Sequence, residues 1–301
     1  MNLAARPWIV ALILGLLVLS PAHAGMTPEE VKAFEGYKGL AEKGDRAAQY
    51  NIGVCYDNGF GVAKDQVQAV SWWRKAAEQG YATAQFNLGV CYADGEGVAK
   101  DQVQAVSWWR KAAEQGYATA QFNLGNRYAN GEGVAKDQAQ ALSWYRMAAE
   151  QGLASAQTNL GNCYNKGEGV AKDQAQALSW YRKAAEQGHA SAQTQLGNCY
   201  YKGNGVAKDQ AQAVSWWRKA AEQGDAQAQF MVALCYDGGH LGMEKDVIEA
   251  YAFYKLGGSF DDLALTNLAK LEKRMSRDEI AAGQKRMKEL QKEIEAKKAG
   301  K

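Results

Sequence analysis

Residues 95–102 read GEGVAKDQ, and this loop returns along the chain at a constant spacing. Close copies begin at residues 59, 131, 167 and 203, so successive copies stand 36 residues apart. A degenerate copy with one extra residue, YDGGHLGMEKD, follows at 236–246. A fixed period in this range is typical of a solenoid, in which each repeat buries its apolar surface against its neighbours. The sequence therefore predicts a repeat protein with atypical units at its ends.

Each repeat is expected to form two helices. In the second repeat, Ala84 and Leu88 stand four residues apart and begin a helical stripe. Gly95 follows that helix, where a left-handed C-terminal cap favours glycine. Asp101 can then cap the backbone N–H groups of the next helix, whose buried stripe includes Trp109. The pattern predicts an all-α fold.

A longer pattern, AQFNLG..Y..GEGV.KD...A..WYRKAAEQG, runs through the central repeats. It resembles the Sel1-like repeat family, a relative of the tetratricopeptide repeats, over about residues 33 to 257. The resemblance implies a right-handed α-α superhelical solenoid with a concave face. It also implies a non-catalytic protein that binds other proteins or peptides and assembles complexes.

The pattern divides the chain into four segments. We predict a signal peptide at 1–24, an N-terminal capping half-repeat at 25–47, six Sel1-like repeats at 48–263 with the last degenerate, and C-terminal capping helices with a basic tail at 264–301.

The first segment has the three parts of a secretory signal. Arg6 supplies a positive charge, an apolar core follows, and Ala22 and Ala24 provide small residues for cleavage after Ala24. An uncleaved membrane anchor is the alternative. No later stretch is apolar enough to span a membrane. We therefore expect a periplasmic or secreted protein with no membrane span after signal removal.

Composition and motifs argue against several kinds of chemistry. The 301 residues carry a formal net charge of +2, so no nucleic-acid partner is expected. In GEGVAKDQ, a helix precedes the glycines and Asp follows the lysine, unlike a phosphate-binding loop. The chain lacks Ser-x-x-Lys and Lys-Thr-Gly, and the two mature histidines, His189 and His240, lack ligand-spaced partners. We predict no catalytic residues, no metal site and no cofactor.

Five cysteines occupy one repeat position: Cys55, Cys91, Cys163, Cys199 and Cys235. Equivalent positions in stacked helices lie roughly 9–10 Å apart, whereas disulfide Cα atoms need less than about 7 Å. We interpret them as small buried packing residues; disulfides in an oxidising compartment are the alternative, so the sequence leaves their redox state open.

The exposed side of the first helices is the candidate binding face. Its residues vary between repeats more than the loops and the core do, from Val and Phe early in the chain to Asn and Thr later. Asn side chains can pair with an extended peptide backbone. An equally weighted alternative is that these polar rows bond only to each other and to neighbouring helices. The predicted partner-binding residues on this concave face are Tyr50, Asn51, Phe86, Asn87, Phe122, Asn123, Asn126, Asn159, Asn162, Lys166, Asn198 and Lys202.

The sequence thus predicts an exported interaction scaffold with a protein or peptide partner of unknown identity. Two other functions remain open. One is binding or hydrolysis of cell-wall fragments or beta-lactams, which rests on family analogy alone. The other is a secreted effector that binds a host protein.

Overall fold

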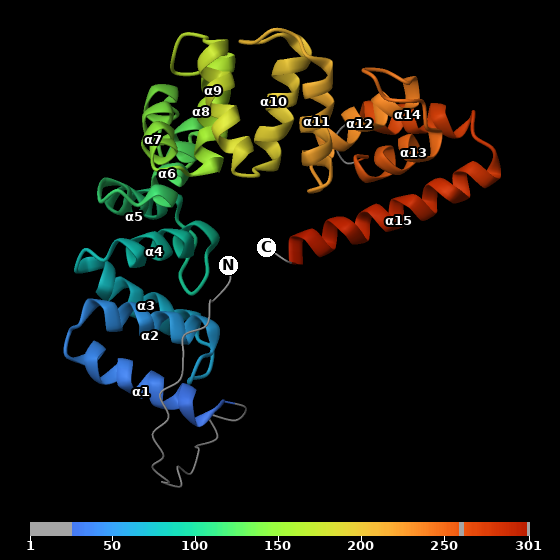
Figure 1. Cartoon of the computed structure of the whole chain (residues 1–301). Helices are drawn as coiled ribbons and strands as arrows, with labels where there is room; N and C mark the ends of the chain where they lie inside the picture. Colours follow the sequence, from blue (N-terminus) through green and yellow to red (C-terminus); the bar gives the residue numbers. More distant parts are fainter. Residues whose placement is uncertain (1–25, 259–261, 300–301) are drawn as a thin grey trace. The chain divides into compact units, whose positions relative to one another are not determined.

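A computed structural model describes residues 26–258 and 262–299, and these residues form helices joined by short loops (Figure 1). The predicted all-α fold of repeated helix pairs is confirmed. The predicted signal peptide, 1–24, lies outside the described residues. The first helices of the six pairs are α2 (Arg46–Asn58), α4 (Ala82–Asp94), α6 (Ala118–Asn130), α8 (Ala154–Lys166), α10 (Ala190–Lys202) and α12 (Ala226–Gly238). The second helices are α3 (Gln66–Glu78), α5 (Gln102–Glu114), α7 (Gln138–Glu150), α9 (Gln174–Glu186), α11 (Gln210–Ala221) and α13 (Val247–Leu256).

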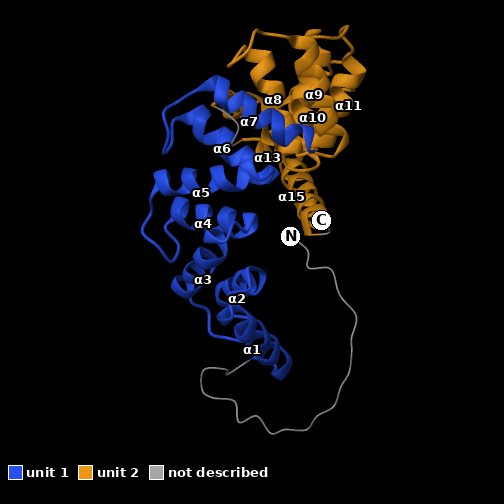
Figure 2. Cartoon of the chain, turned by 90° about the vertical axis from the view of Figure 1, so that its left-hand side faces the viewer, with its two compact units in different colours: residues 1–151 blue, residues 152–301 orange. Residues whose placement is uncertain are grey.

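Three further helices flank the pairs: α1 (Pro28–Glu42), α14 (Asp262–Glu272) and α15 (Arg277–Ala299). The chain divides into two compact units, residues 1–151 and 152–301 (Figure 2). In the second unit α15 packs along α13, where Arg286 Nε donates to Glu249 Oε1 at 2.6 Å. The role of residues 264–301 as a C-terminal cap stays a prediction.

The repeated loop turns the chain and also joins neighbouring repeats. Gly95 has a φ of 83° and caps α4 in the left-handed conformation. Asp101 accepts the N–H groups of Val103 and Gln104, as expected for an N-cap. Gly97 has a φ of 67°, and a Cβ there would collide with the carbonyl of Gln66 in the preceding repeat. The loop therefore needs glycine for backbone conformation and for close packing.

Inside each repeat, a glycine of the first helix packs against an aromatic ring of the second. In the second repeat, a Cβ on Gly89 would lie 2.5 Å from Cδ1 and Nε1 of Trp109. The Trp109 ring is 2% exposed, and its Nε1–H donates to the Phe86 carbonyl at 3.2 Å. The same glycine–aromatic contact recurs at Gly53, Gly125, Gly161 and Gly197. Removing the Cβ lets a large ring fill the space between the two helices.

Within each compact unit, a buried glutamine ladder links a repeat to the one before it. Gln85 Nε2 donates to the Ala77 carbonyl of the preceding repeat at 3.0 Å. Its Oε1 accepts from Gln115 of its own repeat at 2.7 Å. Because both ends of the amide are paired, burial leaves no polar atom of Gln85 unsatisfied. Equivalent buried glutamines are Gln49, Gln121, Gln157, Gln193 and Gln229.

Candidate functional site

The first-helix face, defined as the twelve predicted partner-binding residues, is half-buried except for two exposed lysines, Lys166 and Lys202. Lys166 is held by Glu168, whose Oε1 lies 3.7 Å from its Nζ. The remaining ten residues belong to rows with different surroundings. Their neighbours decide which side chains are available to a partner.

Tyr50 and Phe86 of one row face the turn into the next first helix, whereas Phe122 of the same row packs on Tyr145 of its own helix pair. The Tyr50 ring packs 5.2 Å from Tyr81, and Phe86 packs 5.1 Å from Tyr117, measured between ring centroids. Burial is the main reason that the pKa of Tyr50 is raised. These rings therefore form the seam between repeats.

In the second compact unit, the same row contains polar pairs. Thr158 Oγ1 lies 3.0 Å from His189 Nδ1 and donates to the Ala154 carbonyl. The Thr158 hydroxyl therefore lies between the Ala154 carbonyl and the His189 ring. Thr194 Oγ1 in turn contacts Asp225 Oδ1 at 2.9 Å. The change from aromatic residues to threonine is thus matched by a change in the residue that each one touches.

The row of Asn126, Asn162 and Asn198 is also matched to the second helix of its own repeat. Tyr145 and Tyr181 donate their hydroxyls to Asn126 and Asn162 Oδ1 at 2.7 and 2.8 Å. The Trp217 Nε1–H donates to Asn198 Oδ1 at 3.2 Å. These asparagines provide acceptors for buried aromatic donors, a role that the sequence left open as the alternative to ligand binding.

The third row, Asn51, Asn87, Asn123 and Asn159, stays half-buried at the surface. The Asn87 side chain hydrogen-bonds to Tyr50 of the preceding repeat. It also lines a pocket of about 210 Å³, which we call the N-terminal pocket. The residues lining this pocket are Asp57, Gln66, Trp73, Phe86, Asn87, Val90, Cys91 and Glu96.

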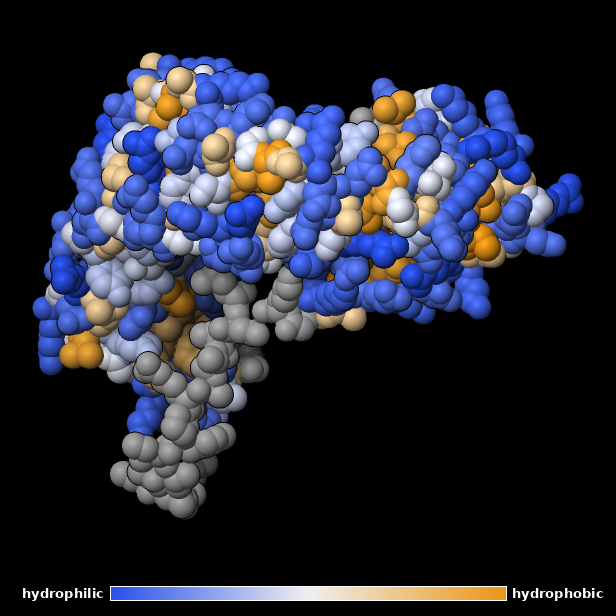
Figure 3. Space-filling model, turned by 45° about the horizontal axis from the view of Figure 1, so that its top comes forward, coloured by the Kyte–Doolittle hydropathy of each residue, from blue (hydrophilic) through white to orange (hydrophobic). Residues whose placement is uncertain are grey.

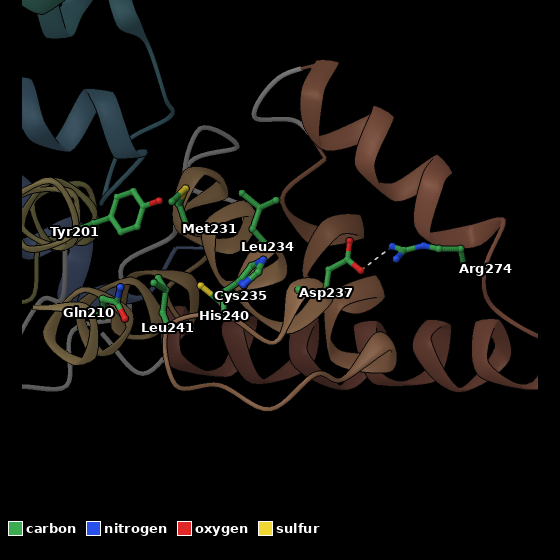
Figure 4. A pocket seen from close by; sticks show the side chains of 10 residues that line it. Tyr201, Gln210, Met231, Leu234, Cys235, Asp237, His240, Leu241 and Arg274 are labelled. Atoms are coloured by element: carbon green, nitrogen blue, oxygen red, sulfur yellow. Dashed lines mark hydrogen bonds and ion pairs between the residues drawn. The ribbon is translucent and has the colours of Figure 1, made fainter.

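A second pocket, the C-terminal pocket, has a volume of about 640 Å³. Figure 4 shows its wall running from Tyr201 of α10, past Met231 and Leu234 of α12, to Arg274 beyond α14. Six of its residues stand four repeats, or 144 positions, after residues of the N-terminal pocket: Tyr201, Gln210, Met231, Leu234, Cys235 and His240. A pocket therefore forms at the same repeat position in both compact units, and different side chains line it.

The degenerate loop shapes the C-terminal pocket. Leu241 lines it with a φ of 57°, and is the one non-glycine residue with a positive φ among residues 26–258 and 262–299. A branched residue in this conformation is strained, and such strain concentrates at functional sites. At the rim, Arg274 Nη2 donates to Asp237 Oδ1 at 2.7 Å (Figure 4). The prediction omitted this pocket, although the extra residue in YDGGHLGMEKD was its signal.

The five cysteines are buried and unpaired. Burial is the main cause that raises the pKa of Cys91 to about 12, and nearby carboxylates add to it. It likewise raises the pKa of Cys163, Cys199 and Cys235 to about 11. At neutral pH these thiols are protonated and weakly nucleophilic.

Among the described residues, no three His, Cys, Asp or Glu side chains gather as metal ligands. In that same part of the chain, none of the helices has the length and apolarity to cross a membrane. The face drawn in Figure 3 is mostly hydrophilic with small separate apolar areas, which is ordinary for a protein surface.

Repeated helix pairs, buried packing residues and pockets at a recurring surface position define the class of helical-repeat interaction proteins. The Sel1 repeat model matches six consecutive segments: residues 46–81, 82–117, 118–153, 154–189, 190–225 and 226–259. The chain belongs to the Sel1 repeat family. Proteins of this family generally mediate protein–protein interactions, and their fold is typically a non-catalytic scaffold.

Two solved structures support this assignment. A protective antigen of uropathogenic Escherichia coli strains is 37% identical with a TM-score of 0.74; the match covers 88% of this chain and 56% of the antigen. A Sel1 repeat protein from Oxalobacter formigenes is 38% identical with a TM-score of 0.71, over 76% of this chain and 91% of that protein. The chain thus spans little more than half the length of the E. coli antigen. None of the curated proteins matches the chain.

Proposed function

We propose that this protein is an exported interaction scaffold that binds a peptide segment of a partner protein on the first-helix face. The observation that carries the proposal is the recurrence of a pocket at one repeat position, in the N-terminal pocket and again in the C-terminal pocket. Pockets with apolar walls and a few polar groups are typical binding sites. Repetition lets one scaffold offer several such sites with separate chemistry.

The two pockets suit side chains of a partner peptide. The N-terminal pocket combines the Phe86 ring with the carboxylates of Asp57 and Glu96. The C-terminal pocket has Met231 and Leu234 in its wall and the Arg274–Asp237 ion pair at its rim. Amide groups such as that of Asn87 stand beside the first pocket and can pair with a peptide backbone.

Export is the second part of the proposal. Residues 1–24 have the charge, apolar core and small cleavage residues of a secretory signal. We propose that cleavage after Ala24 releases a periplasmic or secreted protein. Fractionation into periplasm, medium and membrane tests this, and mature protein retained in the cytoplasm would contradict it.

Site-specific photocrosslinking in the producing cells tests the binding face. A photoreactive phenylalanine replaces Phe86 or Tyr201 beside the pockets, and in control variants it replaces Ser143 or Ser179, which are exposed on second helices. We expect discrete adducts from Phe86 and Tyr201 and none of the same mass from the two serine positions. Equal adducts from all four positions, or none from the pocket positions, would contradict the proposal.

A further inference from the structure

The N-terminal pocket has aromatic walls and a negative rim. Trp73 and Phe86 line its sides, and Asp57 and Glu96 contribute carboxylates. Asp57 accepts from Gln66 Nε2 at 2.7 Å, but among the described residues no cationic group pairs with either carboxylate. The Gln66 Oε1 is itself buried without a partner. Aromatic faces and carboxylates both attract a cationic side chain, and burial strengthens the attraction.

One repeat further on, a positive charge stands at the position of Cys91. Arg127 replaces the cysteine, and its guanidinium lies 5.1 Å from the centroid of the Trp109 ring. Its Nη1 pairs with Glu132, while its Nε is buried without a partner. A guanidinium has five N–H donors, so Glu132 leaves most of them unused. The side chain is 23% exposed and can be reached from the surface.

The two sites occupy equivalent positions of neighbouring repeats. Cys91 and Arg127 stand 36 positions apart in the sequence, and both lie within the first compact unit. Their helices, α4 and α6, each pack on α5, so the sites are separated by at least the roughly 8–10 Å of adjacent packed helices. An extended peptide advances about 3.3–3.6 Å per residue, so a peptide that crosses both sites would place side chains in them about three or more residues apart.

We propose that the first-helix face of the N-terminal unit recognises a peptide that carries a basic side chain and, about three or more residues away, an acidic one. This inference rests on the proposed function. The basic group enters the N-terminal pocket between Phe86, Asp57 and Glu96. The acidic group pairs with Arg127 and displaces Glu132, which holds the guanidinium in the free protein. Charge complementarity therefore selects the partner. The C-terminal pocket does not share this selection, because Tyr201 and His240 replace Asp57 and Glu96 at the equivalent positions.

A random heptapeptide phage library, selected on the full mature chain, tests the proposal. The wild type should enrich peptides with Lys or Arg about three or more positions from Asp or Glu. Asp57→Asn combined with Glu96→Gln should lose the basic preference and keep the acidic one. Arg127→Cys, which restores the residue found in the other repeats, should lose only the acidic preference. Glu150→Gln, on an exposed second-helix site, is the control and should leave both unchanged.

A labelled peptide from the wild-type pool then gives affinities by fluorescence anisotropy. Each pocket variant should bind it about tenfold more weakly or worse, while Glu132→Gln should bind it more tightly because the competing carboxylate is gone. Pools without the charge pair, or unchanged by both pocket variants, would overturn the inference and leave peptide binding standing. If no peptide is selected and no photocrosslink forms at Phe86, the proposed function and this inference both fail. Circular dichroism of each variant verifies folding.

Discussion

Substitution of Gly89 by alanine is the sharpest test of how each repeat is packed. The added Cβ would lie 2.5 Å from two atoms of the Trp109 ring, so the ring must move by about 1 Å to reach ordinary contact. The ring is 2% exposed and hydrogen-bonded to the Phe86 carbonyl, so movement strains the core and weakens that bond. Overpacking costs about 1–3 kcal/mol and the lost bond about 1 kcal/mol. Replacing a helical glycine returns about 0.5–1 kcal/mol. We expect a net loss of about 1–3 kcal/mol in the free energy of unfolding.

Gly36→Ala is the matched control, because Gly36 also lies within a helix but has no atom within 4 Å of its ideal Cβ. It should not lower stability and should raise it by up to about 1 kcal/mol. Urea unfolding followed by circular dichroism at 222 nm measures both variants. If Gly89→Ala is as stable as Gly36→Ala, the tight glycine–tryptophan contact does not determine the packing, and the reasoning is wrong.

Three other perturbations have definite expected outcomes. Gly95→Ala places alanine at a φ of 83° and should lower the unfolding free energy by about 1 kcal/mol, measured by urea titration. Asn162→Ala removes the acceptor of the Tyr181 hydroxyl and should cost about 1–3 kcal/mol in the same assay; a similar loss in a Tyr181→Phe background would contradict this role. Cys91 and the other buried thiols should resist a thiol reagent at pH 8 until urea unfolds the chain. Because their folded pKa is raised, the stability that they contribute is complete below an unfolded pKa of about 8.5 and should fall as pH rises toward about 11–12.

The fold was readable from the sequence because its signals are local and repeated. Gly95 and Asp101 act through their own backbone conformation and the N–H groups next to them, so their roles follow from residue type and position. The period of 36 then fixes the number of helix pairs. The sequence did not predict the glutamine ladder. Gln85 is polar, and its partners, Ala77 and Gln115, lie outside its own helix, so periodicity within one helix does not connect them.

The candidate site was harder to predict because variation between repeats has two causes. A residue differs between copies either because its internal partner differs or because it contacts something outside the chain. Phe86 and Thr158 occupy the same row, but the first packs on Tyr117 and the second contacts His189. The sequence alone cannot pair a first-helix residue with the residue 31 positions later, which stands just before the next first helix. A change of internal partner therefore looked the same in the sequence as a change of ligand.

Internal matching also separates binding candidates from packing residues. Asn162 varies together with Tyr181, so one internal hydrogen bond accounts for it. Asp57 and Glu96 have no cationic partner among the described residues, and Arg127 uses Glu132 for only part of its hydrogen-bonding capacity. Asp57 and Arg127 are half-buried, and a half-buried charge without internal compensation is costly unless something outside the chain pairs with it. Equivalent residues in different repeats can therefore be compared by their internal contacts. Residues whose identity no internal contact accounts for are the candidates for contact with a partner.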